Sequence, residues 1–230
     1  MLEAMDRVVM VSGAARGIGR AVVERLLDSG FRVAAGVRAA HGLQASERLL
    51  VQRYDAESLE SAAAFVAATI ERFGVLHGLV NAAGINPAFA VTEPDETALD
   101  QMWAVNVKGP LRLSRLAMPH LKACGTGRVV NVSSLSGKRV VNTNVGYAMS
   151  KFAVTALTQG LRHDGWHEGV RATALCPGYV ETDMTAGADF PREAMSKPGD
   201  LAVLTEMLLL LPNTAVVGEL LVNCRMEHVI

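Results

Sequence analysis

Seven short apolar segments recur along the 230-residue chain, and this recurrence limits the folds that the chain can adopt. A strand with one face in water alternates apolar and polar residues. These segments are instead continuously apolar, as expected of strands buried on both faces of a parallel sheet. The predicted strands are Arg7–Ser12, Phe31–Val37, Arg48–Arg53, His77–Ala82, Gly127–Ser133, Val170–Cys176 and Val217–Asn223.

Longer stretches rich in Ala and Leu lie between these segments and have the apolar spacing of helices. The predicted helices are Gly17–Ser29, Ser58–Phe73, Glu96–Ala123, Val145–Glu168 and Gly199–Leu211. Because strands and helices alternate, the sequence predicts an α/β fold. We expect a single Rossmann-type doubly wound domain over residues 1–230, with about seven parallel strands and helices on both faces.

One segment, Gly178–Pro198, shows neither period. It carries Pro, Gly, Thr and charged residues between a predicted strand and a predicted helix. A loop of this length inside a compact domain usually covers a ligand. We therefore expect residues 178–198 to cover a substrate.

The charges of the chain nearly cancel, with 22 Lys and Arg against 23 Asp and Glu. Such a balance gives no global field toward nucleic acid or an anionic membrane, so we expect neither as a partner. The first apolar segment begins by Arg7, which leaves no room for a cleavable leader, and no apolar run approaches about 20 residues. We expect a soluble, cytoplasmic protein.

The Cys and His residues do not form the patterns of a metal site. Cys124, Cys176 and Cys224 are far apart and odd in number, which favours free thiols in a reducing compartment. His163 and His167 stand four residues apart, but the Glu that accompanies a helical zinc pair is missing. We expect no metal.

A glycine-rich segment, Ser12–Gly19, follows the first predicted strand and leads into a helix. Glycines at such a turn let the backbone approach a pyrophosphate, while the helix N-terminus offers free N–H groups to the anion. The residues of this turn predicted to bind a dinucleotide are Ser12, Gly13, Ala15, Arg16, Gly17, Ile18 and Gly19.

The spacing Gly-x-x-x-Gly-x-Gly of this turn resembles the short-chain dehydrogenase/reductase family of the classical type. The resemblance continues in family order over nearly the whole chain. Among the members of the family, the chain resembles those like 3-oxoacyl-thioester reductases. The further elements that carry it are Asn81-Ala82-Ala83-Gly84, Asn106, Ser134, Tyr147-Ala148-Met149-Ser150-Lys151 and Pro177-Gly178-Tyr179-Val180-Glu181-Thr182.

Tyr147 and Lys151 stand four residues apart on a predicted helix, so their side chains rise from the same face. A nearby ammonium favours the phenolate, and we expect Lys151 to lower the pKa of Tyr147 from about 10. The resemblance implies that Tyr147 is the acid/base, that Lys151 contacts the nicotinamide ribose, that Ser134 holds the substrate oxygen and that Asn106 maintains a water-linked proton path.

The resemblance also implies where the ligands lie. The substrate would contact Ser134, Tyr147 and Tyr179. The further cofactor-binding residues that it implies are Asp55, Ala56, Asn81, Ala82, Ala83, Gly84, Tyr147, Lys151, Pro177, Gly178, Val180 and Thr182.

The residues at the end of the second predicted strand bear on the choice of dinucleotide. An acid there would accept hydrogen bonds from the ribose hydroxyls of NAD, but the sequence reads Gly36-Val37-Arg38. Two guanidiniums, from Arg16 and Arg38, could converge on a 2′-phosphate. We therefore expect NADP(H), with NAD(H) as the alternative if Arg38 is only a solvated residue.

These features predict an NAD(P)(H)-dependent oxidoreductase that interconverts a secondary alcohol and a ketone. Its substrate would be a small molecule or an acyl thioester, and Lys138 and Arg139 could receive an acidic carrier protein or be merely exposed. An inactive dinucleotide-binding sensor, or an epimerase or dehydratase on the same fold, stays open as an alternative. By resemblance we expect a homo-oligomer, a tetramer, although residues 218–228 lack the family's usual Gly-rich close.

Overall fold

The computed structural model describes residues 1–39 and 42–226, and its centre is a sheet of seven parallel strands. The order β3-β2-β1-β4-β5-β6-β7 is that of a doubly wound sheet, which confirms the predicted fold class. The strands are β1 Val8–Ser12, β2 Arg32–Val37, β3 Leu49–Arg53, β4 Gly78–Asn81, β5 Arg128–Val132, β6 Arg171–Pro177 and β7 Glu219–Val222.

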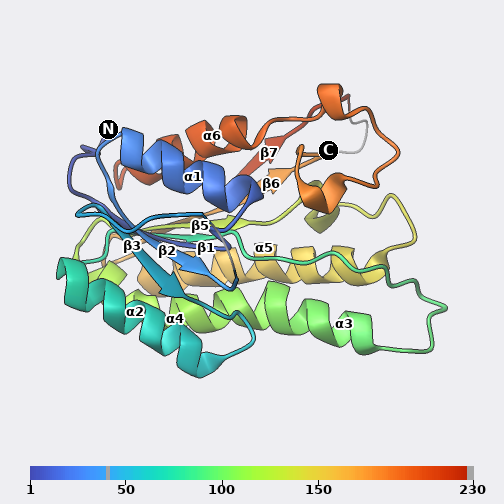
Figure 1. Cartoon of the computed structure of the whole chain (residues 1–230), viewed down its shortest axis with the longest axis horizontal. Coiled ribbons are helices and arrows are strands. Elements are labelled where there is room, and N and C mark those ends of the chain that lie inside the picture. Colours follow the sequence, from blue (N-terminus) through green and yellow to red (C-terminus); the bar gives the residue numbers. More distant parts are fainter. Residues whose placement is uncertain (40–41, 227–230) are drawn as a thin grey trace.

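Helices cover both faces of the sheet (Figure 1). α1 (Gly17–Asp28) and α6 (Pro198–Leu210) pack together on one face, where Val22, Leu26 and Leu201 are fully buried. On the other face lie α2 (Leu59–Phe73), α4 (Gly109–Ala123) and α5 (Val145–Gly165). The two apolar layers on either side of the strands explain why the strand segments are continuously apolar.

The predicted helix Glu96–Ala123 is not one uniform α-helix. It begins as α3 (Thr97–Met102), continues as a π-helical segment (Trp103–Lys108) and then becomes α4. The π-helical segment contains Asn106, whose side chain is buried and bonded to the backbone of a neighbouring loop. Such a widened turn inside a helix often occurs at functional sites.

Two arginines at the amino-terminal edge of the sheet fix the ends of helices. The Arg128 guanidinium donates to the Leu211 carbonyl at 2.9 and 2.7 Å, just past the end of α6, which has no basic residue in its last turn. Arg171 donates to the Trp166 carbonyl at the end of α5. A cation at a helix C-terminus satisfies open carbonyls and interacts favourably with the helix dipole.

The segment 178–198 has more local structure than its sequence suggested. It contains two short 3₁₀ turns, Asp183–Thr185 and Arg192–Ala194, and its two sides pair at a bridge between Val180 and Ser196.

Beyond β7 the chain is described as far as Met226, so Glu227 and His228 of the atypical C-terminus lie outside the described residues. Within the described parts of the chain, every helix is too short or too polar to cross a membrane.

The strand order reverses between β1 and β4, because β2 and β3 lie on one side of this pair and β5 to β7 on the other. Connections therefore leave the carboxyl ends of β1 and β4 in opposite directions. In an open α/β sheet the crevice formed at such a point is where ligands bind. The topology alone places the candidate site between the turn after β1 and the loop after β4.

We predict that His77 makes the fold sensitive to acid. Its Nδ1 accepts the Val8 N–H at 3.0 Å, and burial, aided by the charge of Arg7, lowers the pKa of His77 to about 4. Because this value lies below the usual 6.5, the stabilisation is complete above pH 6.5 and is lost as the pH falls toward 4. Between pH 7 and 4.5, the free energy of unfolding measured in urea should fall by about 1–2 kcal/mol more for wild type than for His77→Asn. Parallel pH curves for the two proteins would contradict this role.

Candidate active site

A cleft of about 550 Å³ opens at the carboxyl edge of the sheet, where the topology placed the site. Its walls come from the turn after β1, the ends of β2 and β4, the residues after β5, the first turns of α5 and the segment after β6. All the predicted site residues line this cleft except Ser12, Asn81 and Asn106. The structure thus gathers residues that are up to 169 positions apart, from Gly13 to Thr182, around one cavity.

The turn after β1 has the shape that a pyrophosphate requires. Gly13 has a φ of +69°, and a Cβ there would stand 2.6 Å from the backbone nitrogen of Ala83. A Cβ on Gly19 would collide with the Gly13 carbonyl. The N-cap residue of α1, Arg16, makes no side-chain cap, so the first N–H groups of α1 keep their donors for an anion in the cleft. These residues fit a bound dinucleotide.

Ser12 and Asn81 are not among the residues that line the cleft. The Ser12 hydroxyl accepts the N–H groups of Ala82 and Ala83 at 3.2 and 3.4 Å. The Asn81 amide donates to Ser114 and to Asn131, both buried. These bonds support the loop after β4 and the neighbouring strand, and the cofactor contacts expected of Ser12 and Asn81 stay predictions. Asn81 Oδ1 has no hydrogen-bond partner among the described residues.

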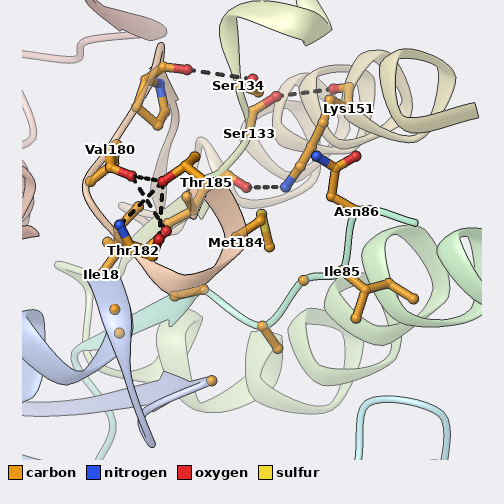
Figure 2. A pocket seen from close by; sticks show the side chains of 18 of the residues that line it. Ile18, Ile85, Asn86, Ser133, Ser134, Lys151, Val180, Thr182, Met184 and Thr185 are labelled. Atoms are coloured by element: carbon orange, nitrogen blue, oxygen red, sulfur yellow. Dashed lines mark hydrogen bonds between the residues drawn. The ribbon is translucent and has the colours of Figure 1, made fainter. Parts of the chain in front are cut away.

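Ser134, Tyr147 and Lys151 come together on one wall. Ser134 follows β5, and its hydroxyl accepts the Ser136 N–H at 3.0 Å. The same hydroxyl donates to the Pro177 carbonyl at 3.4 Å (Figure 2). The Ser134 hydroxyl also acts on the Tyr147 phenol, whose pKa it lowers. Lys151 Nζ donates to the Val132 carbonyl at 2.9 Å and lies 5.5 Å from the centre of the Tyr147 ring. One helical turn thus carries both groups to the end of β5, as their spacing predicted.

The protonation of this pair differs from the expectation. Burial raises the pKa of Tyr147 to about 12, and the hydrogen bond with Ser134 only partly opposes it. Burial also lowers the pKa of Lys151 to about 8. The predicted lowering of the tyrosine pKa by the ammonium is therefore wrong for this structure. Desolvation penalises both charged forms, and the ammonium is bound to a carbonyl rather than to the phenol oxygen.

Asn106 is buried beside the cleft rather than in its wall. Its Oδ1 accepts the Ile85 N–H, and its Nδ2 donates to the Ile85 carbonyl, each at 2.9 Å. Nδ2 also donates to the Ser150 hydroxyl at 3.0 Å, which in turn donates to the Tyr147 carbonyl. Asn106 therefore links the loop after β4 to the helical turn that carries Tyr147.

The two arginines expected at a 2′-phosphate are arranged differently. Arg38 is exposed and lines the cleft at the end of β2, with Asp55 nearby in the same wall. Arg16 instead donates from Nη1 to Asp183 Oδ2 at 2.9 Å. In the described structure an acid from the segment after β6 therefore pairs with one of the two guanidiniums, and their convergence on a 2′-phosphate stays a prediction.

Several lining residues were missed by the sequence reasoning. Asn86 and Asn144 bond to each other at 2.8 Å at the end of the cleft beyond Tyr147. The segment Asn223–Arg225 lines the cleft after β7, and the Arg225 guanidinium lies 5.5 Å from the Tyr179 ring. The available signal was parallel pairing: a strand beside β6 must end at the same edge of the sheet.

Lys138, one of the two basic residues considered for a carrier protein, has an intramolecular partner. Its ammonium pairs with Glu219 of β7 at 2.5 Å, and both side chains are mostly buried. Arg139 lines the cleft. Because the pair ties the segment after Ser134 to the sheet, Lys138 serves the fold more directly than it serves an outside surface.

Comparison with known proteins agrees with this geometry. The family model described as short chain dehydrogenase matches residues 7–191. Agropine synthesis reductase of Rhizobium rhizogenes is 40% identical over 229 residues, which cover 96% of this chain and 53% of the reductase. The 2-(R)-hydroxypropyl-CoM dehydrogenase of Xanthobacter autotrophicus is 37% identical over 194 residues, or 79% of this chain and 77% of the dehydrogenase. A variant of actinorhodin polyketide ketoreductase, crystallised with NADPH, matches with a TM-score of 0.84 and 26% identity over 97% of each chain.

The chain belongs to the short-chain dehydrogenase family, of the classical type. This is a family of oxidoreductases that act on CH–OH donors with NAD(P) as acceptor. The chain spans about half the length of the two agropine synthesis reductases that it matches.

We predict that Gly13→Ala lowers the free energy of unfolding by about 2–4 kcal/mol and weakens dinucleotide binding about tenfold or more. The new alanine would have to keep the left-handed backbone conformation of Gly13, and its Cβ would collide with the backbone of Ala83. Gly125→Ala is the matched control, since Gly125 has the same φ of +69° and no atom lies within 4 Å of the place that its Cβ would take. It should lose only about 1–2 kcal/mol and bind normally. Equal losses of stability and binding in both variants would refute the close approach as the cause.

Proposed function

We propose that this protein is an NADP(H)-dependent oxidoreductase that interconverts a secondary alcohol and a ketone. The observation that carries the proposal is the meeting of Ser134, Tyr147 and Lys151 on one wall of a cleft that begins at the glycine turn. A hydroxyl, a phenol and an ammonium at the end of a dinucleotide-sized cleft are the groups that proton transfer to a carbonyl requires.

In this proposal a bound nicotinamide supplies or accepts the hydride. The Ser134 hydroxyl holds the substrate oxygen, and the Tyr147 hydroxyl, on the same wall of the cleft, exchanges its proton with that oxygen. Lys151, below its pKa of about 8, presents an ammonium beside the phenol and toward the ribose. Asn106 acts behind them, by holding Ile85 and Ser150 where they support the helical turn of Tyr147.

The protonation of Tyr147 suits the role of a proton donor. With a pKa raised to about 12, the phenol keeps its proton throughout the neutral range. A protonated phenol is a donor to a carbonyl oxygen, whereas oxidation of an alcohol needs the phenolate as a base. Tyr147 is therefore ready to donate its proton to a ketone oxygen.

The preference for NADP(H) rests on the end of β2. Arg38 lines the cleft there, and no carboxylate of β2 is present to accept ribose hydroxyls or to repel a 2′-phosphate. Asp55 and Ala56, in the wall beside it, would contact the adenine. Ala82, Ala83 and Gly84 would follow the cofactor toward the nicotinamide end.

The substrate would enter beneath the segment 178–198. Pro177, Gly178 and Val180 would meet the nicotinamide side, and Tyr179, stacked on Phe190 with ring centres 5.1 Å apart, would contact the substrate. The relatives named for hydroxypropyl-CoM and for agropine synthesis support a small-molecule alcohol or ketone as the substrate class.

A homo-oligomer is supported by the exposed apolar side chains of Leu111, Met149 and Phe152 on α4 and α5.

Replacing Tyr147 tests the acid/base assignment. Tyr147→Phe should reduce turnover at least about a thousandfold, because it deletes the proton donor and spares the glycine turn. Affinity for NADPH, measured by fluorescence titration, should change less than about twofold. Turnover is followed by absorbance of the reduced nicotinamide with a panel of aliphatic ketones, aromatic ketones and 3-oxoacyl thioesters. Near-normal turnover in the variant on a ketone that wild type reduces would remove Tyr147 from the mechanism.

Replacing Arg38 tests the cofactor assignment. Arg38→Asp should weaken NADPH binding about tenfold or more and leave NADH binding equal or tighter, since a cation at the 2′-phosphate becomes an anion. Arg53→Asp is the charge-matched control, because Arg53 is exposed at the end of the neighbouring strand β3 but outside the cleft lining. The same shift in the ratio of the two dissociation constants in both variants would mean that Arg38 does not read the 2′ position.

A further inference from the structure

The segment after β6 touches the turn after β1 at two consecutive positions. The Thr182 methyl group would lie 3.2 Å from a Cβ on Gly17, and Asp183 forms the ion pair with Arg16. Figure 2 shows Thr182 beside Ile18, at the start of α1. Asp183 therefore lies next to Arg16, the cationic residue of the glycine turn.

Arg16 lines the same cleft as Arg38 but is paired with Asp183. It follows β1, and Arg38 follows β2, which is the next strand on one side. Asp183 follows β6, which is three strands away on the other side, across β4 and β5. With strands about 4.8 Å apart, a guanidinium that reaches toward the β6 side is drawn away from the end of β2. The Arg16 guanidinium could thus pair with either of two anions on opposite sides, the Asp183 carboxylate or a 2′-phosphate at the end of β2.

Asp183 is the more firmly placed partner of the two. It opens the 3₁₀ turn Asp183–Thr185, and the Thr185 hydroxyl closes this turn onto the Val180 carbonyl at 2.5 Å. Glu181, one residue before Thr182, is held in turn by Lys197 at 2.6 Å. Arg16 has a long side chain that is 78% exposed. When the pair separates, the arginine is the side that moves.

We propose that Asp183 is a specificity-determining residue for the cofactor: it competes with the 2′-phosphate for Arg16 and so restrains the preference for NADP(H). This inference rests on the proposed function. A dinucleotide that carries the 2′-phosphate gains Arg16 only by breaking the ion pair with Asp183, whereas NAD(H) leaves the pair intact. Breaking the ion pair therefore weakens the binding of NADP(H) but not of NAD(H), and it changes the ratio of the two affinities.

The magnitude follows from the exposure of the pair. Both side chains are more than two thirds exposed, and exposed ion pairs contribute little, about two- to fivefold in an equilibrium constant. Asp183→Asn should therefore raise the ratio of the NADH to the NADPH dissociation constant about two- to fivefold. The pyrophosphate is common to both dinucleotides, so any general effect of the lost charge on it cancels in this ratio.

The experiment is a fluorescence titration of the full chain with NADPH and with NADH at low salt. Asp189→Asn is the matched control, because Asp189 is exposed on the same segment and lies outside the cleft lining. It removes the same charge and should leave the ratio unchanged. Arg16→Gln should lower the ratio, and Asp183→Asn added to Arg16→Gln should have no further effect, since the two substitutions act through one guanidinium.

The outcomes separate this inference from the proposed function. If wild type binds neither dinucleotide, the proposed function fails and the role of Asp183 fails with it. If wild type binds NADPH but Asp183→Asn leaves the ratio unchanged, lowers it, or matches Asp189→Asn, the competition is refuted and the proposed function stands. An effect of Asp183→Asn that persists in the Arg16→Gln background would also overturn it, because the acid would then act without the arginine. Thermal unfolding midpoints within about 2 °C of wild type would show that these surface variants fold.

Discussion

The site depends on one close approach of two backbone segments, where β1 and β4 end side by side. Gly13 lacks a Cβ, which would stand 2.6 Å from the nitrogen of Ala83, and the Ser12 hydroxyl binds the N–H groups of the same loop from below. Because the strand order reverses at this pair, the approach sets both walls of the crevice at once. The start of α1, the loop after β4 and the cleft between them all follow from this contact.

Burial decides the chemistry of the wall that faces this contact. Tyr147 and Lys151 share a helical turn, yet desolvation raises the pKa of the phenol and lowers the pKa of the amine. Burial is the largest cause of both shifts, and the ammonium is bound to the Val132 carbonyl. The phenol is consequently a proton donor at neutral pH. The same wall receives support from Asn106, in the π-helical segment, through Ile85 and Ser150.

The segment after β6 connects the substrate and cofactor ends of the cleft. Its sides pair between Val180 and Ser196, and its acid Asp183 reaches the turn after β1. The tyrosine of this segment, Tyr179, lies under Arg225 from the chain beyond β7. A single exposed cation, Arg16, therefore links the segment that would cover a substrate to the turn that would hold a pyrophosphate.

The sequence by itself determined the seven strands, the glycine turn and the helical spacing of Tyr147 and Lys151, because these depend on local periodicity and on residue type. The same local signals could not show which groups Ser12, Asn81 and Asn106 bond to. Only the tertiary structure decided which groups are desolvated and which distant charges meet. The pKa of Tyr147 and the pairing of Arg16 with Asp183, 167 positions apart, depend on burial and distance in space, and neither is encoded in the residues nearby.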